Sequence, residues 1–154
     1  MEIMGLLCHF IRLIKEDWNR MYRLLEIVEG DATRQVQLEN LDTGATELCF
    51  DDSALVSDRN FDFMQIGQQY DCKIKLFGKP VLTKTDTSIT CKVTRTEVII
   101  GERAFTEVVT SCGMYYVPSK NIAEYLPQGS FEFFCTRKDL VQVNGTIHGD
   151  LLSD

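Results

Sequence analysis

Residues 66–79 constrain the fold of this chain more strongly than any other segment. Apolar and charged side chains alternate there, the apolar ones being Tyr70, Cys72, Ile74 and Leu76 and the charged ones Asp71, Lys73 and Lys75. A period of two is typical of a β-strand with one buried and one solvent-facing side. Gly67 and Gly78 bound the run. Similar alternation recurs on both sides, so the sequence predicts a mainly β protein.

At least seven strands, mostly antiparallel, are expected in one closed or nearly closed sheet. The strand-like segments are 21–28, 34–41, 46–50, 70–77, 88–100, 104–110, 114–117, 131–137 and 140–147. A turn is expected at Gly78-Lys79-Pro80, and the last two strands are expected to form a hairpin around Lys138-Asp139. Short helices are predicted within 51–66 and at 120–126. No internal repeat is evident in the sequence.

Three strands, a short helical connection and two long strands are the element order of an OB-fold barrel. The sequence therefore predicts an antiparallel OB-like barrel, with a β-sandwich as the alternative and a C-terminal β extension beyond residue 100. Residues 21–154 are expected to form a single β-barrel domain. Residues 1–20 are expected to be an N-terminal amphipathic helix or a mis-annotated extension, because codons for Lys15-Glu16-Asp17 can contain a ribosome-binding sequence upstream of Met21.

Charge and cysteine content indicate an acidic cytoplasmic protein. The 154 residues carry a net charge of −7, which repels nucleic acid at long range and disfavours it as a partner. Six cysteines are present, none in a Cys-x-x-Cys pair, and we expect Cys49, Cys72, Cys91 and Cys135 to be free buried thiols in a reducing compartment. The apolar run near the N-terminus is too short to span a membrane, so no membrane partner is expected.

Residues suited to catalysis or metal binding are sparse. The two histidines are His9 and His148, and we expect His148 to be a solvent-exposed residue of the C-terminal tail. Asp51 and Asp52 belong to the densest acidic cluster, for which helix capping in solvent is favoured over cation binding. Cys112 is the single candidate nucleophile. We therefore predict no catalytic residue, no metal and no cofactor, with a small cysteine-dependent enzyme as the least favoured function.

Basic residues concentrate in the middle of the chain. Residues 71–105 carry seven basic and four acidic side chains, a net charge of +3. Lys73 and Lys75 project from one side of their strand together with Phe77, and we expect Lys92 of the next strand to lie beside them. In an OB-like barrel these four residues are candidates for a groove that binds single-stranded nucleic acid. The competing interpretation is that the lysines keep a strand soluble.

Aromatic residues form a second concentration near the C-terminus. Phe131 and Phe133 share a strand side and are expected in the core. Phe134, with one of Tyr115 and Tyr116, is expected to face outward, where rigid aromatic rings often anchor a protein partner. The sequence therefore favours a non-catalytic module that binds a protein partner or a second copy of itself, with single-stranded nucleic-acid binding as the alternative.

Overall fold

The computed structural model describes residues 20–152, which form nine strands and four short helices. The elements are β1 (Met21–Glu29), β2 (Arg34–Asn40), β3 (Thr46–Asp51), α2 (Ser53–Val56), β4 (Gln69–Val81), β5 (Ile89–Ile100), β6 (Arg103–Val109), β7 (Met114–Pro118), η1 (Ser119–Asn121), η2 (Ala123–Gln128), β8 (Ser130–Val143), β9 (Thr146–Ile147) and η3 (Gly149–Leu151). Hydrogen bonds join all nine strands into one mixed sheet. The prediction of a mainly β chain with short helices is confirmed for this part of the protein.

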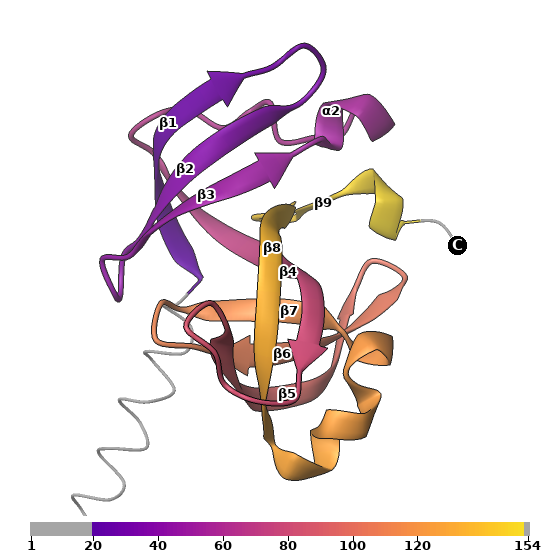
Figure 1. The fold of residues 1–154 in the computed structure, drawn as a ribbon. Coiled ribbons are helices and arrows are strands. Elements are labelled where there is room, and N and C mark those ends of the chain that lie inside the picture. The colour runs from indigo at the N-terminus through magenta and orange to yellow at the C-terminus, as the bar shows by residue number, and fades with distance from the viewer. Residues whose placement is uncertain (1–19, 153–154) are drawn as a thin grey trace, which may run out of the picture.

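The sheet closes on itself twice, and the long strands β4 and β8 belong to both strand rings. In the first ring, β1, β2 and β3 are joined to β4 and β8, and a parallel pair between Phe50 and Asp139 closes it. In the second ring, β5, β6 and β7 are joined to the same two strands, and a parallel pair between Lys75 and Tyr116 closes it. The two sets of three strands lie at opposite ends of the molecule, with β4 and β8 running between them (Figure 1).

The order of elements repeats, although the sequence shows no repeat. Each half consists of three antiparallel strands, a short helical connection and one long strand: β1–β2–β3–α2–β4 and β5–β6–β7–η1–η2–β8. The closing pairs correspond, and Lys75 and Asp139, one from each pair, are direct partners in the β4–β8 ladder. The strands after residue 100 therefore belong to the same sheet as the strands of the first half.

Strand β4 does not end at Gly78, so the turn predicted at Gly78-Lys79-Pro80 is wrong. These residues continue the ladder, with Lys79 opposite Phe134 and Pro80 opposite Phe133. Gly78 lies at a bulge against β8, where a Cβ atom would overlap the carbonyl oxygen of Phe134. The glycine is needed here for close approach of two backbones rather than for a turn.

Strand β8 is also continuous, so the hairpin predicted around Lys138-Asp139 is wrong. Asp139 is accepted inside the strand because Arg137, two residues earlier on the same side, binds its carboxylate. The hairpin lies instead at Asn144-Gly145, between β8 and β9, where Asn144 adopts a left-handed φ of 52°. Asn144 tolerates this conformation better than most residues.

The main core lies inside the strand rings and confirms the predicted register of β4. Its members include Tyr70, Cys72, Ile74, Leu76, Cys91, Phe131 and Phe133. Ile89 and Val93 pack against it but remain half-buried. All three lysines Lys73, Lys75 and Lys92 are expected to be exposed, and Lys92 is. Lys73 and Lys75 lie on the side of β4 opposite the core but are half-buried, so the prediction is wrong for these two.

The described cysteines are all free: Cys49, Cys72, Cys91, Cys112 and Cys135. No helix in residues 20–152 combines the length and apolar content needed to cross a bilayer. The helix or extension predicted for residues 1–20 lies outside the described residues, apart from Arg20.

We predict that Gly78→Ala destabilises the protein by about 1–3 kcal/mol, because the added methyl group collides with backbone that cannot rotate away. Urea unfolding followed by circular dichroism measures the change. Gly145→Ala is the matched control, since nothing lies within 4 Å of its added Cβ, and it should change stability by about 0.5 kcal/mol or less. Equal effects of the two substitutions would contradict the close approach of β4 and β8.

Candidate anion-binding site

A cavity of about 500 Å³ lies where the second strand ring meets the C-terminal segment. Residues of β4, β6, the end of β7, η1 and η3 line it, namely Lys75, Leu76, Phe77, Gly78, Arg103, Ala104, Phe105, Pro118, Lys120, Asn121 and Leu151. Three of these side chains are cationic and none is acidic. We call this cavity the basic groove.

Local structure explains how the three cations converge. Lys75 projects outward from β4, Arg103 begins β6 after the tight turn at Gly101, and Lys120 lies in η1 directly after β7 ends at Pro118. Lys75 and Lys120 form no hydrogen bond or ion pair with any described residue. Their ammonium groups are therefore available to an anionic ligand.

The floor of the groove is a small second core outside the strand rings. Phe105 and Leu151 pack there with Ile100, Tyr116 and Val141. The C-terminal segment is fixed over this core because the Glu102 N–H donates to the Leu151 carbonyl at 2.6 Å. One wall of the groove thus depends on residues more than forty positions away in sequence.

Beside the groove, aromatic and cationic side chains alternate in a row. The Arg137 guanidinium lies 4.4 Å from the centroid of the Phe50 ring and 4.9 Å from that of Phe77, and the Lys75 ammonium lies 5.5 Å from Phe77. Asp139 holds Arg137 through two hydrogen bonds of 2.5 and 3.1 Å, which raise the pKa of the guanidinium. We call Phe50, Arg137, Phe77 and Lys75 the aromatic–cation row.

The structure brings together two of the four predicted groove residues. Lys75 and Phe77 both line the basic groove. Lys92 does not lie beside them, and that prediction is wrong, because β5 is separated from β4 by β8 on one side and by β6 and β7 on the other. Sequence reasoning missed Arg103, although it lies in the basic stretch, and it missed Lys120, Arg137 and Phe50, for which no local pattern gave a signal.

Lys73 belongs to a different environment. Its ammonium lies 5.8 Å from the centroid of the Tyr116 ring, and its pKa is lowered, mainly by burial and then by the positive charge of Arg20. Glu107 is buried nearby and accepts hydrogen bonds from Thr94, Arg95 and Tyr116. Burial opposes its ionisation, but these hydrogen bonds outweigh burial and lower the Glu107 pKa. Lys73 therefore lies over the Tyr116 ring, outside the basic groove.

Tyr115 and Tyr116 are both buried, so the prediction that one of them faces outward is wrong. Neighbouring residues of a strand point to opposite sides, but both sides of β7 are covered, by the main core and by the second core. The Tyr115 hydroxyl donates to buried Glu47, and the Tyr116 hydroxyl to Glu107 at 2.9 Å. Burial raises the pKa of both phenols.

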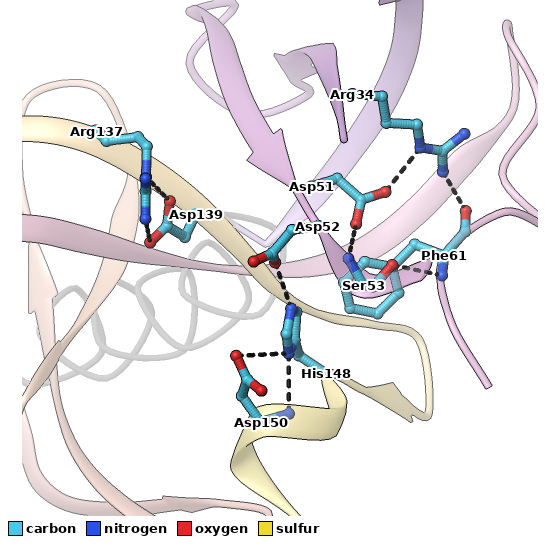
Figure 2. Close-up of polar contacts among 9 residues, drawn as sticks. All are labelled: Arg34, Asp51, Asp52, Ser53, Phe61, Arg137, Asp139, His148 and Asp150. Atoms are coloured by element: carbon cyan, nitrogen blue, oxygen red, sulfur yellow. Dashed lines mark hydrogen bonds and ion pairs between the residues drawn. The ribbon is translucent and has the colours of Figure 1, made fainter. Parts of the chain in front are cut away.

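His148 is buried, so the prediction of an exposed tail residue is wrong. Figure 2 shows its ring between Asp52 and Asp150, with Nε2 at 2.6 Å from Asp52 Oδ1. The backbone N–H of Asp150 donates to Nδ1 at 3.1 Å, which leaves the ring proton on Nε2 to bind Asp52. The contact ties the C-terminal segment to the residue before α2.

Asp51 is likewise buried rather than solvated. It accepts hydrogen bonds from the Arg34 guanidinium at 2.7 Å and from the Ser53 backbone N–H at 2.9 Å (Figure 2). Arg34 also donates to the Phe61 carbonyl at 2.5 Å. The predicted acidic cluster is therefore divided between two internal contacts, one for each aspartate.

Within residues 20–152, Asp52, His148 and Asp150 are the group whose ligand atoms lie close enough to hold a metal ion together, within 4.8 Å. A metal needs a free nitrogen lone pair, but Nδ1 of His148 accepts the Asp150 N–H and Nε2 carries the proton. As arranged, these residues form a structural clamp. The same hydrogen bonds leave neither ring nitrogen facing a substrate.

Cys112 is exposed at the edge of a second cavity, of about 510 Å³, lined by Lys84, Ser88, Ile89, Thr90, Thr110, Ser111, Cys112, Tyr115 and Lys138. His148, the histidine of the described part of the chain, is not among these residues. The cavity thus offers the thiol no histidine base, and a cysteine-dependent mechanism has no support in this arrangement.

No family model, curated protein or solved structure matches the chain. Function is therefore inferred from the geometry of the described residues.

We predict that His148→Ala destabilises the protein by about 1–3 kcal/mol, because Asp52 is left without its buried hydrogen-bond donor and the C-terminal segment loosens. Chemical denaturation measures the loss. Asp150→Asn is the matched control, since Asp150 binds the ring mainly through its backbone N–H, and we expect a change of about 0.5 kcal/mol or less. A larger effect of the control would show that the carboxylate, not the backbone, orients His148.

We also predict that iodoacetamide modifies Cys112 in the native protein long before Cys49, Cys72 or Cys91. Burial raises the pKa of all three buried thiols, that of Cys91 to about 12, and it also shields them from the reagent. Peptide mass spectrometry after timed labelling at pH 8 measures the order, with denatured protein as the control. Rapid native labelling of a buried cysteine would contradict the assigned core.

Proposed function

We propose that the protein is a non-catalytic binding module that holds single-stranded nucleic acid in the basic groove. One observation carries the proposal: Lys75, Arg103 and Lys120 line one cavity with Phe77, and no carboxylate lines it. Cations bind phosphate oxygens, and an exposed aromatic ring offers a surface for base stacking. A groove with both features suits a flexible anionic strand.

We interpret both strand rings as OB-like. In each ring a three-stranded antiparallel unit is followed by a short helix and a fourth strand, and a fifth strand runs parallel to the third. The fifth strand of each ring is the fourth strand of the other. The basic groove then belongs to the second ring, at the helical connection η1. The free cysteines support a reducing, cytoplasmic location for the protein.

The net charge of −7 does not oppose a local site of this kind. At physiological ionic strength, charges separated by more than about 8 Å are largely screened. The ligand therefore experiences mainly the cations that line the groove, while the acidic side chains elsewhere reduce long-range attraction. The proposal predicts moderate affinity with a clear dependence on salt.

Binding of a protein partner is the second candidate function. The aromatic residues that favoured it in the sequence are mostly buried. Phe134 and one of Tyr115 and Tyr116 are the residues expected to anchor a partner, but both tyrosines are buried and Phe134, at 37% exposure, is the one of these three on the surface. Failure of nucleic-acid binding in the following experiment would favour this candidate.

We predict that a fluorescein-labelled oligothymidylate of fifteen nucleotides binds the protein at 25 mM NaCl, as measured by fluorescence anisotropy. The double substitution Lys75→Glu with Lys120→Glu should weaken binding by about tenfold or more, because two phosphate contacts are lost. The slope of log Kd against log salt concentration should fall by about 1.4, or about 0.7 for each contact with a single strand.

The matched control is Lys84→Glu with Lys92→Glu. It changes net charge by the same amount at two exposed lysines that do not line the groove. When the variants are compared at 150 mM NaCl, where charges more than about 8 Å apart are largely screened, it should leave the affinity within about threefold of wild type. Equal losses in the two double variants would show that overall charge, not the groove, determines affinity.

A further inference from the structure

We infer that the bases of the bound strand stack on Phe77 while Lys75 and Lys120 hold its phosphates, so that affinity depends on the bases and not on charge alone. The inference rests on the proposed function and adds the mode of recognition. In this arrangement the bound nucleic acid runs from the basic groove along the aromatic–cation row toward Phe50.

Phe77 is suited to stacking by its exposure and position. The side chain is 47% exposed although it projects from the middle of a long strand, and it forms part of the groove wall. Lys75 and Arg137 lie over the ring, so a base reaches it by displacing the Lys75 ammonium. A flat nucleobase placed against the ring would remove this apolar surface from water.

Arg137 and Phe50, the part of the aromatic–cation row beyond Phe77, are held rigidly. Arg137 is the direct cross-strand partner of Phe77, and Phe50 is the partner of Asp139 in the pair that closes the first strand ring. Arg137 is fixed by Asp139 and lies between the Phe50 and Phe77 rings. The three side chains are thus oriented before a ligand arrives, which lowers the entropy cost of stacking.

Lys75, by contrast, is free to change its contact. Its ammonium lies 5.5 Å from the Phe77 ring and forms no ion pair with any described residue. A base that takes its place over the ring allows the ammonium to move to the adjoining phosphate. One lysine therefore links the phosphate contacts of the groove to the stacking position on Phe77.

The test compares oligothymidylate with an abasic fifteen-residue strand that has the same phosphates and no bases. We expect the wild-type protein to bind oligothymidylate roughly 5- to 100-fold more tightly, the range for stacking one base on an aromatic side chain. Phe77→Ala should abolish this difference and leave binding of the abasic strand unchanged. Phe63→Ala is the control, because Phe63 is similarly exposed, at 45%, but lies before β4 and outside the groove.

A second variant keeps the test independent of folding. Phe77→Trp, in a Trp18→Phe background, places an indole at the stacking position, and its fluorescence should be quenched by oligothymidylate but not by the abasic strand. Equal binding of the two strands by wild type, without quenching, would overturn the inference and leave the groove as an anion site. Failure of both strands to bind at 25 mM NaCl would overturn the proposed function as well.

Discussion

The antiparallel pairing of β4 with β8 is the constraint on which the rest of the structure depends. Both strands are long enough to take part in two strand rings, and each ring closes only because β4 and β8 are already joined. The bulge at Gly78 shifts the register between the two strands, and the glycine lets their backbones approach closely. A side chain at Gly78 would therefore disturb both rings together, and with them the wall of the basic groove.

The two halves differ in charge where the helical connection follows the third strand. Arg34 and Arg103 begin the corresponding strands β2 and β6, and Ser53 and Ser119 begin the corresponding helices α2 and η1. In the first half, Asp51 binds Arg34 and the residue after the serine is Ala54. In the second half, the residue that pairs with Val117 is Thr106, and Lys120 follows the serine. The first half thus has an arginine–aspartate pair before its helix, whereas the second half has Lys120 in its helix, at the basic groove.

Buried polar contacts explain why so few ionisable residues remain for a ligand. Glu47 is bound by Tyr115 and Lys138, Glu107 by Arg95 and Tyr116, and Asp52 by His148. The Glu47 and Asp52 contacts join segments distant in sequence, whereas the Glu107 contacts join neighbouring strands, and every contact holds its carboxylate in an internal hydrogen bond. The lysines of the basic groove differ because neither forms an ion pair with a described carboxylate. Position at the cavity, rather than an internal partner, distinguishes Lys75 from Lys73, whose ammonium lies over the Tyr116 ring.

The sequence by itself determined that the chain is mainly β and which side of β4 is buried, because alternation over residues 70–77 reflects a local backbone period. It also indicated Lys75 and Phe77, which share the outward side of β4. Only the tertiary structure decided what covers each outward side: a second core over Tyr116, the C-terminal segment around His148, and β8 beside Gly78. Ring closure likewise depends on pairings such as Lys75 with Tyr116, between residues far apart in the chain. Local patterning does not reveal such partners. Arg103, Lys120 and Arg137 could therefore be identified as site residues only from the tertiary structure, in which β4 and β8 pair.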